Sequence, residues 1–110
     1  MNNRPDSAAL IAEMVRRIVK TCDPERIILF GSHARGTPGP DSDADFLVIT
    51  RLNGDRRDVR LAIRRSLSGI GLAKDVVVVT PEEVERYQGC AGTIIRMALR
   101  DGKVLYQRAA

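Results

Sequence analysis

The sequence predicts a mixed α/β (α+β) domain, in which helices pack against one small mixed β-sheet. Short apolar runs of strand length alternate with longer segments whose apolar residues recur every three or four positions, as on one face of a helix. Turns that contain glycine or proline separate these segments. A length of 110 residues provides one hydrophobic core but not two, so we expect a single domain over residues 1–110.

The first half of the chain is predicted to form a helix followed by two strands. Apolar residues from Leu10 to Val19 form one wide helical stripe, and Asp6 or Ser7 can cap the start of this helix. The second strand is apolar at nearly every position after Asp45, so we expect other elements to cover both of its faces. The expected elements are a helix at 6–20, a strand at 26–30, a helical turn at 32–35, a loop at 36–40 and a strand at 43–50.

The second half is predicted to combine three helices with two further strands. Thr80 and Glu83 have the spacing of a capping box at the start of a short helix that opens with Pro81. Gly102 is expected to stop the last helix. The expected elements are a helix at 55–67, a strand at 74–80, a short helix from 81, a helix at 91–100 and a small strand at 103–106.

The helix at 55–67 is predicted to be strongly basic on its outer side. Its inner face is formed by Val59, Ile63 and Leu67. Five arginines lie mostly outside that face: Arg56, Arg57, Arg60, Arg64 and Arg65. Such a face suits solvent, a nucleic acid or an acidic partner surface. The two tyrosines and two phenylalanines of the chain lie elsewhere, so direct nucleic-acid binding is not expected.

Composition excludes several classes of protein. The chain is 44% hydrophobic and 29% charged, which is ordinary for a soluble globular domain. No apolar run approaches the roughly 20 residues that span a bilayer, and the N-terminus has no apolar signal region. Cys22 and Cys90 are too few for a disulfide framework or a zinc site, so we expect them to be reduced, small apolar residues. We therefore expect a cytoplasmic protein that does not enter a membrane.

A glycine and a serine end the first apolar strand. Gly31 has no side chain, so a phosphate can approach its backbone closely. Ser32 offers a hydroxyl and an amide at the start of a helical turn, where unpaired N–H groups favour an anion. Arg35 is near enough in sequence to reach the same phosphates. No Gly-Lys-Ser/Thr sequence follows, and a lone Gly-Ser is a common turn, so this pair predicts phosphate binding only in combination with other residues.

Two aspartates begin the second apolar strand. Residues i and i+2 of a strand share a face, so Asp43 and Asp45 are expected to project side by side. A divalent cation relieves the repulsion between neighbouring carboxylates, and hard oxygen ligands suit Mg²⁺. Asp43 also fits a helix cap or a loop acid. Asp45 leads directly into a buried strand, where a cation or an arginine must compensate its charge.

A third aspartate stands near the start of the third apolar strand. Asp75 precedes four valines, and it would lie beside Asp43 and Asp45 if the two strands are neighbours. Three carboxylates around two divalent ions could then align an attacking oxygen with a leaving phosphate. The alternative is a charged residue at the edge of a sheet.

These residues resemble the signature of the nucleotidyltransferase superfamily, which includes DNA polymerase beta. The motifs that carry the resemblance are Gly31-Ser32, Arg35-Gly36, Ser42-Asp43-Ala44-Asp45 and Asp75. The size of the chain and the run Ile-Leu-Phe-Gly-Ser-His-Ala-Arg-Gly at 28–36 resemble the smallest branch, the minimal nucleotidyltransferase (MNT) domain proteins. The resemblance extends to the ending at 99–106. His33 lies where the family varies, so we expect it to face solvent or phosphate rather than to act as a catalytic base.

The resemblance implies a nucleotidyltransferase fold and the transfer of AMP from ATP to an acceptor with two Mg²⁺ ions. By matching positions, Asp43 and Asp45 would hold both metal ions. Asp75 would bind the metal ion on the nucleophile side and help to deprotonate the acceptor. Gly31 and Ser32 would hold the outer phosphates.

The resemblance also implies a protein acceptor. Larger relatives bind their acceptor with an added domain, for which 110 residues leave no room, so we expect a partner or a second subunit to provide it. Minimal members are typically encoded beside a HEPN-domain RNase toxin. They act as antitoxins by binding the toxin and by adenylylating a tyrosine near its active site. The leading hypothesis is therefore a protein adenylyltransferase antitoxin, as a homo-oligomer or as a hetero-oligomer with the toxin.

Two alternatives remain open from the sequence. The first keeps the enzyme but makes the acceptor a small molecule such as an aminoglycoside. The second is a non-catalytic antitoxin that neutralises its partner by binding alone. The presence of all three carboxylates, Asp43, Asp45 and Asp75, argues against a dead enzyme but does not rule out inhibition by docking.

Overall fold

A computed structural model describes residues 7–39 and 42–109, and within them five helices pack around one four-stranded sheet. The helices are α1 (Ser7–Cys22), α2 (Ser32–Arg35), α3 (Arg56–Ser66), α4 (Pro81–Tyr87) and α5 (Ile94–Asp101). The strands are β1 (Arg26–Phe30), β2 (Ala44–Ile49), β3 (Lys74–Val79) and β4 (Lys103–Gln107). This confirms the predicted mixed α/β class and the predicted order of elements. Asp6, one of the two expected helix caps, and Pro40, in the expected loop, lie outside the described residues.

Several element boundaries differ from the prediction because capping residues stand just outside the helices. Asp55 caps α3 instead of belonging to it, since its carboxylate accepts a hydrogen bond of 3.0 Å from the Arg57 amide. Thr93 caps α5 in the same way, with a hydrogen bond of 3.1 Å from the Arg96 amide, so this helix starts later than expected. The second strand begins at Ala44, which leaves Asp43 just before it.

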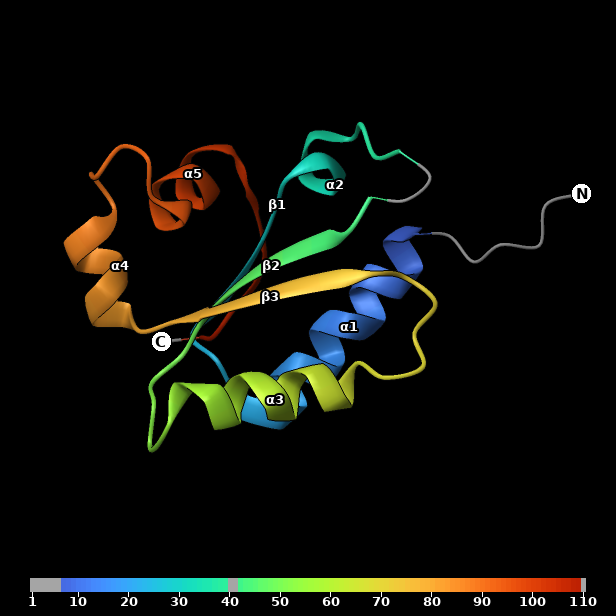
Figure 1. Ribbon diagram of the computed structural model, residues 1–110, viewed down its shortest axis with the longest axis horizontal. Coiled ribbons are helices and arrows are strands. Elements are labelled where there is room, and N and C mark those ends of the chain that lie inside the picture. Colours follow the sequence, from blue (N-terminus) through green and yellow to red (C-terminus); the bar gives the residue numbers. More distant parts are fainter. Residues whose placement is uncertain (1–6, 40–41, 110) are drawn as a thin grey trace, which may run out of the picture.

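The sheet has the strand order β3-β2-β1-β4, with β1 and β2 in the centre (Figure 1). β1 is antiparallel to both of its neighbours, whereas β2 and β3 are parallel. A parallel pair needs a crossover connection, which α3 provides. The crossover brings the starts of β2 and β3 to the same end of the sheet.

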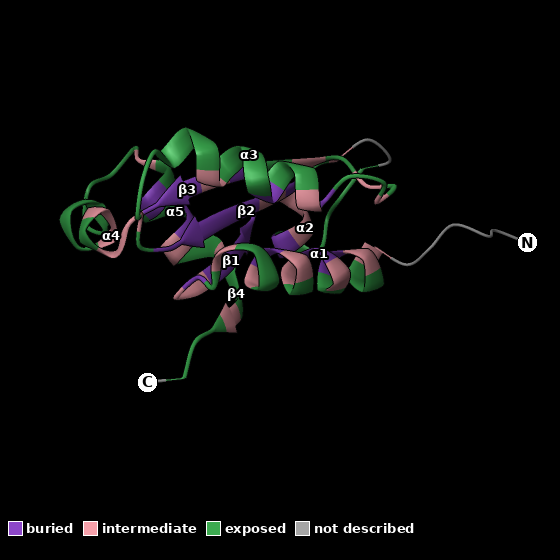
Figure 2. Ribbon diagram, turned by 90° about the horizontal axis from the view of Figure 1, so that it is seen from below, coloured by how far each residue is buried: buried purple, intermediate pink, exposed green. Residues whose placement is uncertain are grey.

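Two hydrophobic clusters cover the two faces of the sheet. α1 and α3 lie on one face, and their buried residues pack with alternate strand residues that include Phe46, Val48, Val76 and Val78. Leu47 and the other intervening residues pack with α5 on the opposite face. Figure 2, seen from the side of α1 and α3, shows the buried strands behind these two helices, with exposed residues along the outer sides of α1 and α3. Both faces of β2 are therefore covered, as its continuous apolar sequence predicts.

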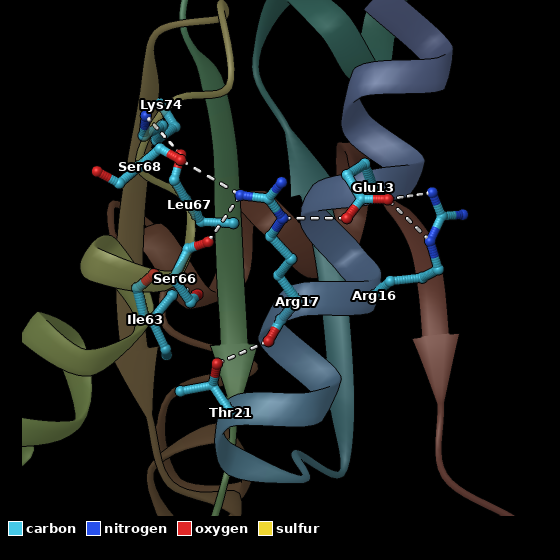
Figure 3. A network of polar contacts seen from close by, with 9 residues as sticks. All are labelled: Glu13, Arg16, Arg17, Thr21, Ile63, Ser66, Leu67, Ser68 and Lys74. Carbon is cyan, nitrogen blue, oxygen red and sulfur yellow. Dashed lines mark hydrogen bonds and ion pairs between the residues drawn. The ribbon is translucent and has the colours of Figure 1, made fainter.

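A polar network joins the end of α3 to α1 (Figure 3). The Arg17 Nη1 group donates hydrogen bonds to the carbonyl oxygens of Ser66, at 3.0 Å, and Ser68, at 3.3 Å. Lys74 Nζ donates to the Leu67 carbonyl oxygen at 3.2 Å. These bonds satisfy carbonyl groups at the C-terminal end of α3, and they hold α3 against both α1 and the start of β3.

The cysteines only partly follow the prediction. Both are free thiols, and Cys22 is half-buried against the helix that contains it. Cys90 is exposed, so it is not the small apolar packing residue that we expected. None of the helices in 7–39 and 42–109 has the length and apolar character needed to cross a membrane.

Candidate active site

The turn after β1 places a glycine directly against a carboxylate. Gly31 has φ 77° and ψ −157°, a combination open to glycine but strained for other residues. A Cβ atom on Gly31 would lie 2.3 Å from Oδ2 of Asp45. Both the backbone conformation and the neighbouring side chain therefore require glycine here. The sequence predicts this glycine for close approach of a phosphate, and the structure adds that it makes room for Asp45.

Asp45 and Asp75 are brought together by the register of the parallel strands. They are direct Cα partners in the β2–β3 pair, so their side chains leave the same face of the sheet. That face is the one covered further along by α5, because Leu47 and Val77 belong to its hydrophobic cluster. The second and third strands are therefore neighbours, which is the condition under which Asp75 was expected to lie beside the first pair of aspartates.

The electrostatic environment of Asp45 disfavours its ionised form. Burial raises the pKa of the Asp45 carboxyl, and the carboxylates of Asp75 and Asp43 raise it further. His33 and Arg35 oppose this shift, but they do not overcome it. Asp45 makes no ion pair within the described residues. Of the two expected ways to compensate its charge, a cation or an arginine, these residues therefore provide no directly paired arginine.

Asp75 lies at the open edge of the sheet, where it meets an arginine. β3 is an edge strand, and the Asp75 side chain is 52% exposed. Arg60, from α3, reaches around this edge. Its Nε group donates a 3.0 Å hydrogen bond to the Val76 carbonyl oxygen, and its Nη2 atom lies 3.9 Å from Oδ1 of Asp75. The sequence groups Arg60 with the outward-facing arginines, so it does not predict the contact between Arg60 and Asp75. The only signal for this contact in the sequence is that Arg60 lies one helical turn from both Arg56 and Arg64.

His33 has a structural contact that the sequence did not predict. Its side chain is half-buried, and Nε2 lies 3.1 Å from the Ser42 carbonyl oxygen. A carbonyl oxygen only accepts, so Nε2 carries the proton in this hydrogen bond. His33 thereby ties α2 to the segment that leads into Asp43. No sequence pattern predicts this bond, because nine residues separate the two partners.

The remaining predicted residues, Ser32 and Arg35, belong to α2 beside this turn. Ser32 is the first residue of α2 and is half-buried. Arg35 ends the helix with an exposed side chain, and within the described residues it forms neither a side-chain hydrogen bond nor an ion pair. Its influence on the pKa of Asp45 places its positive charge within electrostatic reach of the carboxylates.

The donor set suits a divalent cation. Asp43, Asp45 and Asp75 offer hard carboxylate oxygens. The pKa of Asp45 is raised first by burial and then by the neighbouring charges of Asp75 and Asp43. In 7–39 and 42–109, no three acidic, histidine or cysteine side chains are already gathered into a metal-binding cluster. A cation bound between these carboxylates would offset the repulsion that Asp43 and Asp75 exert on Asp45.

Comparison with known proteins assigns the chain to a family. Residues 10–108 match the nucleotidyltransferase domain family. The chain belongs to this family. The match spans almost the whole sequence, including Gly31, Asp45 and Asp75, and it confirms the resemblance on which the expected chemistry depends. No significant match was found among curated proteins.

Solved structures share the nucleotidyltransferase fold. A protein from Sulfolobus solfataricus assigned as a nucleotidyltransferase is 21% identical, with a TM-score of 0.62 over 98% of this chain and 94% of that chain. A toxin–antitoxin structure with AMP-PNP is 22% identical, with a TM-score of 0.61 over 88% of this chain and 73% of that chain. A mutant of the toxin–antitoxin MntA–HpeT is 18% identical, with a TM-score of 0.62 and the same coverage. At these identities the similarity establishes the fold, so the chemistry of this nucleotidyltransferase domain must be argued from its own residues.

Proposed function

We propose that this nucleotidyltransferase transfers AMP from ATP, with Mg²⁺, to a tyrosine of a HEPN-domain RNase toxin and so acts as its antitoxin. The observation that carries the proposal is the pairing of Asp45 with Asp75 at an open sheet edge. Asp45 is half-buried beside the Gly31 turn, whereas Asp75 is about half exposed. An acceptor from another protein can therefore approach the Asp75 side while ATP occupies the side of the turn.

The proposed reaction forms one bond and breaks one. The acceptor oxygen bonds to the α-phosphorus of ATP, the bond from that phosphorus to the bridging oxygen breaks, and pyrophosphate leaves. In this proposal Asp75 accepts the proton of the tyrosine hydroxyl, which is the role that its exposed position suits. Positioning and charge neutralisation provide most of the rate enhancement in chemistry of this kind.

Residues on both sides of the reacting phosphate have separate roles in the proposal. Gly31 and Ser32 hold the outer phosphates, and Arg35 adds positive charge beside them. Asp43 and Asp45 would hold two Mg²⁺ ions, one of them together with Asp75; bound Mg²⁺ supplies neutralisation of charge on the phosphates. Without cations, the carboxylates and the triphosphate would repel one another.

The structural neighbours support this choice of nucleotide and partner. One of them is described as a toxin–antitoxin with AMP-PNP, an analogue of ATP. In the MntA–HpeT mutant, two aspartates two positions apart are replaced by glutamate. Asp43 and Asp45 have the same spacing. These descriptions apply to the neighbours. For this chain they support a proposal in which ATP is the nucleotide, Asp43 and Asp45 form the acidic pair, and a toxin is the partner.

The test uses the protein encoded in the reading frame that adjoins this one. The two purified proteins are incubated with Mg²⁺ and with ATP labelled at either the α- or the γ-phosphate. AMP transfer labels the partner from α-labelled ATP alone, because pyrophosphate carries the γ-label away. Mass spectrometry then locates the adduct, which the proposal places on a tyrosine.

A variant pair separates this proposal from the alternatives. Asp43→Asn with Asp45→Asn should abolish labelling, whereas Asp58→Asn, an exposed acid on α3, should leave it unchanged. Labelling of the partner by the double variant would contradict the catalytic assignment. Full neutralisation of the toxin by the same variant would instead support inhibition by docking, and labelling of an aminoglycoside by the chain alone would support a small-molecule acceptor.

A further inference from the structure

We propose that the outer side of α3 is a docking surface for an acidic surface of the acceptor protein. This surface, here called the arginine face, consists of Arg57, Leu61, Arg64 and Arg65. The identity of the docked protein as the acceptor depends on the proposed function; the existence of the docking surface does not.

The structure divides the arginines of α3 into two groups. Arg56 and Arg60 are engaged within the chain: Arg56 Nη2 pairs with Glu83 at 3.0 Å, and Arg60 bonds to the Val76 carbonyl oxygen. The side chains of Arg57, Arg64 and Arg65 make no hydrogen bond or ion pair within 7–39 and 42–109. Their charges are therefore available to a partner, which the sequence alone does not reveal.

The unengaged arginines share one face of the helix with an exposed apolar residue. Residues 57, 61, 64 and 65 follow the i, i+4, i+7, i+8 spacing of a single face. Ile63 and Leu67, on the opposite side, are fully buried. Leu61 is 38% exposed between the arginines. Figure 2 shows the outer side of α3 as an exposed surface along most of its length.

Like charges make this face unfavourable for the isolated chain. Arg64 and Arg65 are neighbours in sequence, and Arg57 and Arg64 each lie within one turn of Arg60, so positive charges crowd this side of α3. Asp58 is the one acidic residue of α3, and it forms no ion pair among the described residues. An acidic surface that binds here would relieve the repulsion, and this complementarity defines the partner's chemistry.

The composition of the face favours a protein over a nucleic acid. An apolar residue with arginines around it is typical of protein interfaces, where arginine is enriched and apolar residues occupy the centre. Leu61 would have no counterpart on a phosphate backbone. α3 also has no aromatic residue on which a base could stack.

The arginine face continues toward the candidate active site. Arg57 and Arg64 lie on the same side of α3 as Arg60, whose guanidinium reaches around the open edge of β3 to Asp75. A protein bound to the arginine face can therefore extend along this edge to the acceptor side of the site. Docking would raise the local concentration of the acceptor group near Asp75.

The experiment measures association with the protein of the adjoining reading frame at several salt concentrations. The test variant is Arg57→Glu, Arg64→Glu and Arg65→Glu; a milder form replaces the same residues by Gln. The control, Lys20→Glu, Arg96→Glu and Lys103→Glu, changes net charge equally at exposed side chains elsewhere. Circular dichroism melts identify any variant that fails to fold, in which case the Gln form provides the comparison.

The expected result is a loss of association rate specific to the arginine face. At low salt the test variant should associate at least about tenfold more slowly, and the control less than about twofold more slowly. The difference should shrink toward 1 M salt, where the Debye length falls to about 3 Å. Equal rates for test variant and control, or no association of the unmodified chain, would overturn the proposal. So would arginine-dependent binding of an RNA of about 20 nucleotides without any effect on protein association.

Labelling with α-labelled ATP separates this proposal from the proposed function. The test variant should lose labelling at low partner concentration and regain it as the partner concentration rises, because docking affects KM more than kcat. Arginine-dependent association without any labelling would support the docking surface and overturn the proposed reaction. Labelling with the same KM in the test variant as in the unmodified chain would overturn the docking surface and leave the reaction intact.

Discussion

Asp45 and Asp75 are direct partners across the parallel β2–β3 pair, so two carboxylates leave the same face of the sheet at the same level. The backbone hydrogen bonds of the sheet hold them there, although Asp75 raises the pKa of the Asp45 carboxyl. The fold thus holds two mutually repelling carboxylates together, and a bound cation would relieve their repulsion.

Removing the charge of Asp45 should stabilise the chain. Asp45→Asn eliminates both the burial of a charge and its repulsion by Asp75 and Asp43. We expect the melting temperature at pH 7 to rise by about 2–5 °C, measured by circular dichroism. Asp58→Asn is the matched control. It removes an acid from the first turn of α3, where negative charge is favourable, so it should not stabilise.

The gain from Asp45→Asn should depend on pH in a defined direction. The folded-state pKa of Asp45 is raised above its unfolded value, so protonation favours the folded state. Below the unfolded pKa the residue is neutral in both states, and wild type and variant should melt alike. As pH rises through the folded pKa, wild type loses this stability, and a difference in melting temperature between wild type and variant appears. A difference in melting temperature that is the same from pH 3 to pH 8 would contradict the electrostatic explanation.

Gly31 should tolerate no side chain while Asp45 is present. We expect Gly31→Ala to lower the free energy of unfolding by about 3 kcal/mol, because it combines backbone strain with a contact of Cβ on the Asp45 carboxylate. Gly36→Ala is the control: φ is also positive, but among residues 7–39 and 42–109 a Cβ atom at Gly36 would meet no non-neighbouring atom within 4 Å, so a loss of about 1 kcal/mol is expected.

A double-mutant cycle with Asp45→Ala isolates the steric part of this effect. In that background the loss caused by Gly31→Ala should be smaller by at least about 1 kcal/mol in urea unfolding, because the carboxylate oxygen is gone. Additive effects of the two substitutions would show that Gly31 is required for its backbone conformation alone.

Mg²⁺ should stabilise the chain through the carboxylates at this end of the sheet. At ten times its dissociation constant, a bound ion raises the free energy of unfolding by about 1.4 kcal/mol. Thermal melts at pH 7 should show this gain, and EDTA should reverse it. Asp43→Asn with Asp45→Asn should remove the gain, and acidification to pH 4 should reduce it, because cations bind the ionised carboxylates. An equal gain in the double variant would place the ion elsewhere.

The contacts of Arg17 should contribute more to stability than those of Arg16, one residue earlier on α1. Both arginines pair with Glu13, but Arg17 also bonds to the Ser66 and Ser68 carbonyl oxygens of the α3 end. We expect Arg17→Met to cost about 1–2 kcal/mol and Arg16→Met less than about 0.5 kcal/mol in urea unfolding. Similar losses for the two substitutions would show that the bond across the helices contributes little.

The elements with local signals were predictable from the sequence. The strand at 26–30 and the helical turn at 32–35 have the expected bounds. The capping box is confirmed by hydrogen bonds from the Glu83 amide to Thr80 Oγ1, at 3.1 Å, and from the Thr80 amide to the Glu83 carboxylate, at 2.9 Å. These features depend on residues within a few positions of one another, so the sequence contains what is needed to predict them.

Gly102 illustrates where local reasoning fails. It does follow the last helix, but its φ of −86° is not the left-handed conformation that makes glycine a common helix stop. Its small size is required instead by packing: a Cβ atom would lie 2.4 Å from the Ala98 carbonyl oxygen and 2.6 Å from Ile28 Cγ2. Ile28 belongs to a strand far away in the sequence, so no local pattern could reveal this contact.

The sequence by itself determined where each strand lies to within a residue or two, and that Gly31, Asp45 and Asp75 stand near strand ends, because apolar periodicity and turn residues act over short distances. The tertiary structure alone decided that β3 pairs with β2 in the register that joins Asp45 to Asp75, and that Arg60 reaches around the edge of β3 to Asp75. Register and crossover packing depend on the burial of both sheet faces at once, which involves residues from every helix and strand.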